Sequence, residues 1–228
     1  LSASVGRWNI GSSELFVDRQ GLCSARPSGF WAFHPSPLPR QIELTQELSV
    51  LLDQATGAVH RLGGVGRLLP NAHLVIGPHL RLEAVQSSKI EGTRTDVGQL
   101  LLFEAGRAPD EEARADAEEV RNYVDAMEHG RRRLGEDFPL SMRLFREMHK
   151  VLLRGVRGRY RRPGELRTSS VWIGGSSLNN AVFVPPPPER AMEALDDLEL
   201  FLHDDSLPLL IQLGLAHYQF EAIHPFLD

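Results

Sequence analysis

Residues 215–228 read LAHYQFEAIHPFLD, an apolar helical pattern that runs directly into a proline turn. Proline lacks a backbone N–H and its ring collides with the preceding turn, so Pro225 predicts that the helix ends there and leaves His224 at its exit. Phe226 can pin the turn to a core, and Asp228 places a carboxylate near an imidazole that titrates around neutral pH. These residues alone allow two interpretations: a capped helix end, or a site with a general base and a metal-binding acid.

The composition is that of a globular protein with a real core: the chain has 228 residues, 42% of them hydrophobic, and a formal net charge of −5. Cys23 is the only cysteine, which excludes an intrachain disulfide and a CxxC site. The arginine clusters at 131–133 and 157–162 are too short to predict nucleic-acid binding, although the second could meet a nucleotide phosphate. Without a long apolar run or a signal-peptide pattern, we expect a cytoplasmic protein that does not enter a membrane.

Apolar periodicity predicts a mainly α fold. The first 40 residues are rich in proline and without sustained period, which predicts an extended arm. Predicted core faces include Met192, Leu209 and Leu213. The helices expected from spacing and cap signals cover about 42–62, 78–92, 95–105, 110–130, 141–152, 188–202 and 208–223.

One β element interrupts the helices. Two β-prone runs, VWI at 171–173 and AVFV at 181–184, flank the turn-forming stretch GGSSLNN, a pattern that predicts a β-hairpin over 171–184. A lone hairpin in a helical protein is marginally stable, so we expect it to pack on the helices or to offer its edge to a partner's backbone.

Two groups of polar residues are candidates for chemistry. His217, Glu221 and His224 follow helical spacing and share a face, as in helical zinc sites, but the order is not HExxH. Hydrogen bonding of His217 and Glu221 near the core is therefore the favoured interpretation, with a zinc hydrolase as the alternative. Ser87 and Glu91 also share a face, and taken alone they are typical of a solvated helix surface.

Together, these segments resemble the Fic family. HPFLD at 224–228 matches the start of the family signature HPFx(D/E)GNGR, and SSKIEG at 87–92 matches the inhibitory motif (S/T)xxxE(G/N) of members whose inhibitory helix precedes the core. Three further stretches resemble the segment around the family's flap hairpin: RPGELR at 162–167, WIGG at 172–175 and AVFVPPPP at 181–188.

The resemblance implies two regions, an N-terminal arm and helix over 1–75 and a core over 76–228. The core would be a helical bundle with one β-hairpin flap that transfers AMP from ATP, bound with Mg²⁺, to a Ser, Thr or Tyr hydroxyl of a target protein. His224 would be the catalytic base, Asp228 would bind Mg²⁺ and the nucleotide, and Phe226 would anchor the loop at the nucleotide site. The flap would align the target segment as an added strand through Val171, Trp172, Ile173, Val182, Phe183 and Val184.

The resemblance also implies regulation. Ser87, Glu91 and Gly92 would form the inhibitory motif on the helix over 78–92, with the Glu91 carboxylate opposing productive binding of ATP. The sequence departs from the family after Asp228, because the Gly-Asn-Gly-Arg that cradles the phosphates is missing from it. We therefore expect this polypeptide alone to be truncated and inactive, and the parent protein to be an auto-inhibited adenylyltransferase.

The alternative function is that of a catalytically silent Fic-like regulatory or interaction protein. Self-modification and homodimerisation are both compatible with the family resemblance. Nucleic acid would be bound only through a C-terminal region that is not in this sequence.

Overall fold

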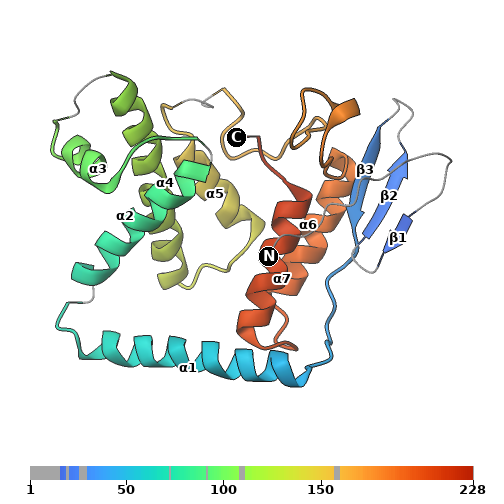
Figure 1. The fold of residues 1–228 in the computed structure, drawn as a ribbon, viewed down its shortest axis with the longest axis horizontal. Coiled ribbons are helices and arrows are strands. Elements are labelled where there is room, and N and C mark those ends of the chain that lie inside the picture. Colours follow the sequence, from blue (N-terminus) through green and yellow to red (C-terminus); the bar gives the residue numbers. More distant parts are fainter. Residues whose placement is uncertain are drawn as a thin grey trace.

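The computed structural model describes residues 16–18, 21–25, 30–71, 73–90, 92–107, 111–156 and 160–227. Within these ranges the chain forms seven α-helices, a three-stranded antiparallel sheet and one 3-10 helix, so the predicted mainly α fold is confirmed (Figure 1). The elements in chain order are β1 (Phe16–Asp18), β2 (Gly21–Ala25), β3 (Trp31–Pro35), α1 (Gln46–Leu68), α2 (His73–Ile90), α3 (Val97–Glu104), α4 (Glu111–Gly135), α5 (Met142–Leu152), η1 (Leu178–Asn180), α6 (Pro188–Leu202) and α7 (Leu209–Ile223).

The helices form two groups, α2 to α5 in one and α6 with α7 in the other, while α1 runs along the base between them (Figure 1). Each group has its own apolar core, centred on Val85 and Val120 in the first and on Leu198 and Phe201 in the second. The rings of Phe145 on α5 and Phe220 on α7 pack 5.2 Å apart and connect the two groups. The turn that follows α7 therefore lies between them.

The N-terminal sheet was not predicted. Strands β1, β2 and β3 pair in an antiparallel meander, with Cys23 opposite both Phe16 and Phe33. Strand β3 also contacts the segment that precedes α6, where the Phe33 N–H donates to the Val184 carbonyl at 2.9 Å. Strands of three to five residues carry too little alternation to be recognised in a proline-rich stretch, so an extended arm was expected instead.

Four predicted helix boundaries were wrong. Helix α1 begins at Gln46, after the Thr45 cap, rather than near residue 42. Helix α1 continues through the glycines at 63, 64 and 66 to Leu68, and α4 continues through Gly130 to Gly135. Helix α2 begins at His73, five residues before the expected start, with Pro78 inside it. A glycine costs a helix about 1 kcal/mol and a proline near the first turns removes few bonds, so neither must end a helix that neighbouring residues favour.

The predicted core faces of α6 and α7 were partly wrong, because Met192, Leu209 and Leu213 are exposed. The buried face of α7 carries two glutamines instead. Gln212 donates to the carbonyls of Phe201 and Asp204, and Gln219 donates to the carbonyl of Ser36 at 3.0 Å. These amides bond carbonyls at the core boundary, at the end of α6, in the loop after it and at Ser36, so the buried face of α7 is polar at two positions.

Candidate active site at the end of helix α7

Helix α7 ends with His224 in a left-handed backbone conformation, with φ 48° and ψ 67°. The His224 N–H donates to the Phe220 carbonyl at 2.9 Å, and Pro225 prevents the helix from continuing. This conformation costs a residue with a side chain about 1–2 kcal/mol, so it persists only where other contacts determine it. His224 thus stands at the helix exit, as the sequence predicted, and is half-buried there.

Phe226 fixes the far side of the turn. Its ring stacks on the imidazole of His149, with 4.3 Å between centroids, and lies at a tilt to Phe220 at 6.2 Å. His149 is buried on α5, and its Nδ1 accepts the Gly164 N–H at 2.9 Å. The position of this histidine could not be predicted from the sequence, because a single polar residue within an apolar helix stripe has many explanations.

Arg167 holds the near side of the turn, a role that its sequence context did not predict. Its Nε donates to the His224 carbonyl at 2.7 Å, its Nη2 donates to the Ile223 carbonyl at 3.0 Å, and its backbone N–H donates to the Pro225 carbonyl at 2.9 Å. The side chain is buried, and desolvation lowers its pKa to about 10, against a smaller opposing effect of the Glu189 charge. The guanidinium therefore remains charged at neutral pH beside the negative end of the α7 dipole.

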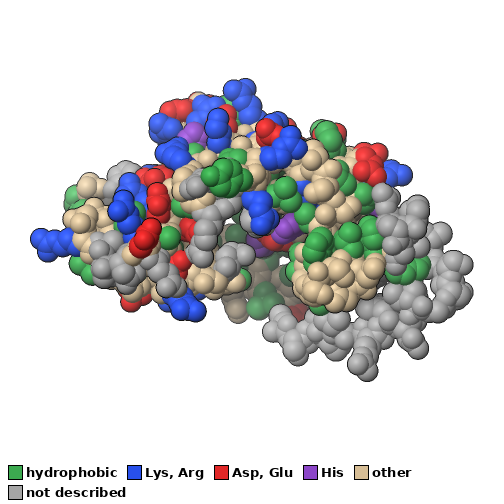
Figure 2. Space-filling view, turned by 90° about the horizontal axis from the view of Figure 1, so that it is seen from above, with side chains coloured by type: hydrophobic (Ala, Val, Ile, Leu, Met, Phe, Trp, Pro, Cys, Tyr) green, Lys and Arg blue, Asp and Glu red, His purple; other side chains and the backbone are tan. Residues whose placement is uncertain are grey.

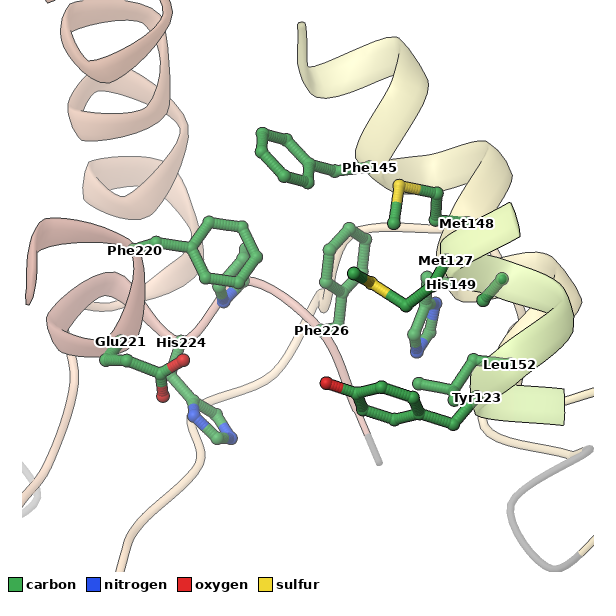
Figure 3. Close-up of a pocket in the computed structure, with 12 residues that line it drawn as sticks. Tyr123, Met127, Phe145, Met148, His149, Leu152, Phe220, Glu221, His224 and Phe226 are labelled. Atoms are coloured by element: carbon green, nitrogen blue, oxygen red, sulfur yellow. The ribbon is translucent and has the colours of Figure 1, made fainter. Parts of the chain in front are cut away.

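Two cavities meet at His224. One, of about 250 Å³, lies between α4, α5 and α7 and has mostly apolar walls. Figure 3 shows Phe226 in its middle, with Glu221 and His224 on the α7 side and Tyr123, Met127 and His149 opposite. From above, the surface is hollowed between the two helix groups, with histidine side chains visible inside the hollow (Figure 2).

The second cavity, of about 230 Å³, lies where the flap segment approaches the turn. His224, Phe226 and Leu227 line it from the turn, with Trp172 from the flap and Arg161 from the loop before it. An imidazole, a cation and an aromatic ring therefore share one small cavity. Each cavity alone is slightly below the range of about 300–1,000 Å³ that is typical of small-molecule sites.

The prediction of a regular β-hairpin over 171–184 was wrong. Among the described residues of this segment, the pairing is a single antiparallel bridge, in which Ile173 N–H donates to the Phe183 carbonyl at 2.8 Å. The interior folds on itself instead, because the Asn180 carboxamide oxygen accepts the N–H groups of Ser176 and Ser177 and the 3-10 helix η1 takes up the remaining residues.

The six predicted flap residues separate into two sets. Trp172, Ile173 and Val182 are exposed and available to a partner. Val184 is buried against Phe30 and Ala32. The half-buried residues are Val171, which lines the second cavity, and Phe183, whose ring packs 5.7 Å from Phe33.

Two family models match this chain: the N-terminal model of the Fic/DOC family over residues 50–132, and the Fic/DOC family model over residues 139–228. The chain belongs to the Fic/DOC family. The signature turn at His224 lies within the second match, and the α2 segment with Ser87 lies within the first.

Solved structures share the fold. A Fic family protein from Desulfovibrio desulfuricans G20 is 23% identical with a TM-score of 0.64, and the match covers 84% of this chain and 55% of that one. A Fic domain containing signaling protein from Bacteroides thetaiotaomicron VPI-5482 is also 23% identical, with a TM-score of 0.53. That match covers 65% of this chain and 56% of the other. The chain thus spans little more than half the length of these two relatives.

Two of the three residues predicted to form an inhibitory motif, Ser87 and Gly92, lie in the described part of this Fic/DOC protein. The Ser87 hydroxyl donates to the Glu83 carboxylate at 3.0 Å and accepts the Tyr123 hydroxyl at 3.4 Å, which connects α2 to a residue lining the first cavity. Gly92 has φ 99° and ends α2 through a bond from its N–H to the Lys89 carbonyl, a conformation that favours glycine. Glu91, the predicted inhibitory carboxylate, lies outside the described residues, as does Asp228.

The predicted alternative of a helical zinc site gains no support. His217 and Glu221 are both exposed, so the prediction that they form hydrogen bonds near the core was also wrong. In the part of the chain that the structure describes, no three His, Cys, Asp or Glu side chains gather as a metal-binding group. The same described part contains no helix that is both long and apolar enough to span a membrane.

Proposed function

We propose that this Fic/DOC protein transfers AMP from ATP to a Ser, Thr or Tyr hydroxyl of a target protein. The observation that carries the proposal is the shared cavity of His224, Arg161 and Trp172, which brings an imidazole together with a cation and the flap. Family membership makes a nucleotidyl transfer the reaction to consider first.

His224 acts as the general base in this proposal. Its imidazole takes the proton of the target hydroxyl while the hydroxyl oxygen attacks the α-phosphorus; the bond from that phosphorus to the bridging oxygen breaks, and pyrophosphate leaves. Imidazole suits the role because it is available in the neutral form near physiological pH. A backbone fixed on both sides, by Arg167 and by Phe226, keeps the base from drifting away from the hydroxyl.

The side chains around His224 supply only some of the contacts that a nucleotide needs. Arg161 offers a cation for phosphate oxygens, and Trp172 offers a flat apolar surface. Asp228 would hold Mg²⁺, since hard cations prefer oxygen ligands, and the ion would neutralise charge on the phosphates when bound. Because each cavity is small, we expect the flap to shift when ATP binds.

The exposed edge of the flap would receive the target. Trp172, Ile173 and Val182 present apolar side chains to solvent, and the segment has only one internal bridge, so its backbone can still pair with an extended peptide. Such pairing would bring a hydroxyl on the target strand toward His224.

Activity would be held low by the motif on α2. Glu91 would oppose the γ-phosphate by charge, and Ser87 and Gly92 would support and terminate the helix that carries it. Displacement of α2 would then relieve the inhibition.

The test is incubation of the full-length protein with α-labelled ATP and Mg²⁺ in a cell lysate. We expect Glu91→Gly to label itself or a lysate protein, Glu91→Gly/His224→Ala to lose the label, and Glu91→Gly/His217→Ala to keep it. His217 is the matched control, because it lies on the same helix but is exposed and lines neither cavity. Normal ATP binding by Glu91→Gly without transfer would favour the silent interaction protein instead.

A further inference from the structure

The Arg167 guanidinium contacts three separate segments of the chain. Besides the carbonyls of Ile223 and His224, it donates from Nη1 to the Ser169 carbonyl at 3.1 Å and from Nη2 to the Pro186 carbonyl. Ser169 precedes the flap segment and Pro186 follows it. One buried side chain therefore joins both ends of the flap to the residue that ends α7.

These contacts are directed at the backbone of His224. The last carbonyls of a helix have no hydrogen-bond partner within the helix. Because His224 is left-handed, the carbonyls at the end of α7 point in other directions than they would in a continuing helix. Arg167 satisfies the carbonyls of both Ile223 and His224 in that arrangement, with a planar group whose donors have fixed relative directions. A lysine could carry the charge to this place but not the same set of directed bonds.

We propose that Arg167 is a positioning residue, which holds His224 in its left-handed conformation and sets the flap at a fixed place relative to it. This inference rests on the proposed function for its effect on catalysis, but its structural part is independent of that function. It predicts that the imidazole of His224 moves when the guanidinium is removed, even where the protein remains folded.

The test compares Arg167→Met and Arg167→Lys with Arg146→Met, each in the full-length protein. Arg146 is a matched control, because its Nε also donates to a carbonyl of the neighbouring loop, that of Gly164 at 2.8 Å. It is exposed, and within the described part of the chain its side chain makes no hydrogen bond or ion pair with α7 or with Ser169 and Pro186 at the flap ends. The imidazole signals of His224 are recorded by NMR and assigned with His224→Gln, and AMP transfer is measured in the Glu91→Gly background.

We expect Arg167→Met to shift and broaden the His224 signals and to lower kcat about 100-fold, with the KM for ATP unchanged, because a small displacement of a reacting group has an effect of that order. Arg167→Lys should restore part of both readouts, and Arg146→Met should alter neither. Unchanged His224 signals in a folded Arg167→Met protein would overturn the proposal. Unfolding of both Arg167 variants would also overturn it, since the residue would then sustain the whole fold rather than the turn.

The readouts separate this inference from the proposed function. If the His224 signals shift in Arg167→Met but the protein never transfers AMP, the positioning role is supported and the proposed activity is rejected. Full AMP transfer by a folded Arg167→Met protein would retain the activity and reject the positioning role.

Discussion

The ring of Phe226 stacks on the imidazole of His149, with planes 19° from parallel and centroids 4.3 Å apart. Because His149 also accepts the Gly164 N–H, the stacked pair attaches the turn after α7 to α5 and to the loop that leads to Arg167. Gly164 has φ 80°, and a Cβ there would lie 2.9 Å from the Arg146 carbonyl, so this attachment requires glycine. The turn is therefore held by packing on one side and by hydrogen bonds on the other.

Removal of the Phe226 ring should destabilise the protein. Buried phenylalanine-to-alanine changes cost about 3–5 kcal/mol, and because Phe226 is only half-buried we expect Phe226→Ala to lose about 2 kcal/mol in urea denaturation. Tyr160→Ala is the control, since that residue is 83% exposed, and should change the free energy of unfolding little. Equal losses in the two variants would show that the stacking contributes nothing.

Gly130 should be a packing glycine rather than a helix terminator. A Cβ at this position would lie 2.6 Å from the Met148 sulfur, at the contact between α4 and α5. Gly130→Ala gains about 1 kcal/mol of helix propensity, but the flexible thioether of Met148 must move away from the new methyl group, and this movement offsets part of the gain, so we expect less stabilisation than at a helix glycine that meets no neighbour.

Gly64→Ala provides the matched control for that change. This glycine is also inside a helix, but a Cβ there would meet nothing within 4 Å. It should therefore stabilise the protein by up to about 1 kcal/mol. Thermal denaturation of both variants checks the pair, and equal stabilisation by Gly130→Ala and Gly64→Ala would contradict the packing at α4 and α5.

Glu147 should make stability depend on acid pH. The hydrogen bond from His129 lowers the pKa of this carboxyl, and the hydrogen bond and charge of Arg133 lower it further. A carboxyl with a lowered pKa stabilises the fold above its ordinary value, about 4.3, and loses that contribution as the pH falls through the folded-state pKa. The free energy of unfolding should therefore fall more steeply in wild type than in Glu147→Gln below about pH 4.3.

The exposed ion pair of Glu165 and Arg162 supplies the comparison for Glu147. Pairs of this kind contribute little, so Glu165→Gln should follow the wild-type curve. Urea titrations at several pH values measure all three proteins. Parallel curves for wild type and Glu147→Gln would show that the contacts of Glu147 do not stabilise the folded state.

The sequence predicted those parts of the molecule that depend on local pattern. The helices α3, α5, α6 and α7 were expected close to their observed ranges, because apolar spacing and cap residues act over a few neighbours. At the start of α3, for example, the structure shows a reciprocal capping box of Asp96 and Gln99. The exit of His224 from α7 followed from Pro225 for the same reason.

What the sequence did not reveal depends on residues far apart in the chain. The contact of Gly130 with Met148 turns an expected helix stop into a packing site. The bond from Phe33 to Val184 brings an N-terminal strand to the flap. Arg167 could not be distinguished from neighbouring arginines, because its role arises only where α7 and the two ends of the flap come together.

The chemistry itself is tested most directly by the position of the label in ATP. Full-length Glu91→Gly protein is incubated with Mg²⁺ and either α-labelled or γ-labelled ATP, and protein-bound label is counted after denaturation. Transfer of AMP through His224 predicts label from the α position alone, and none from either position in Glu91→Gly/His224→Ala. Protein-bound label from the γ position, or α label that persists without the His224 imidazole, would contradict it.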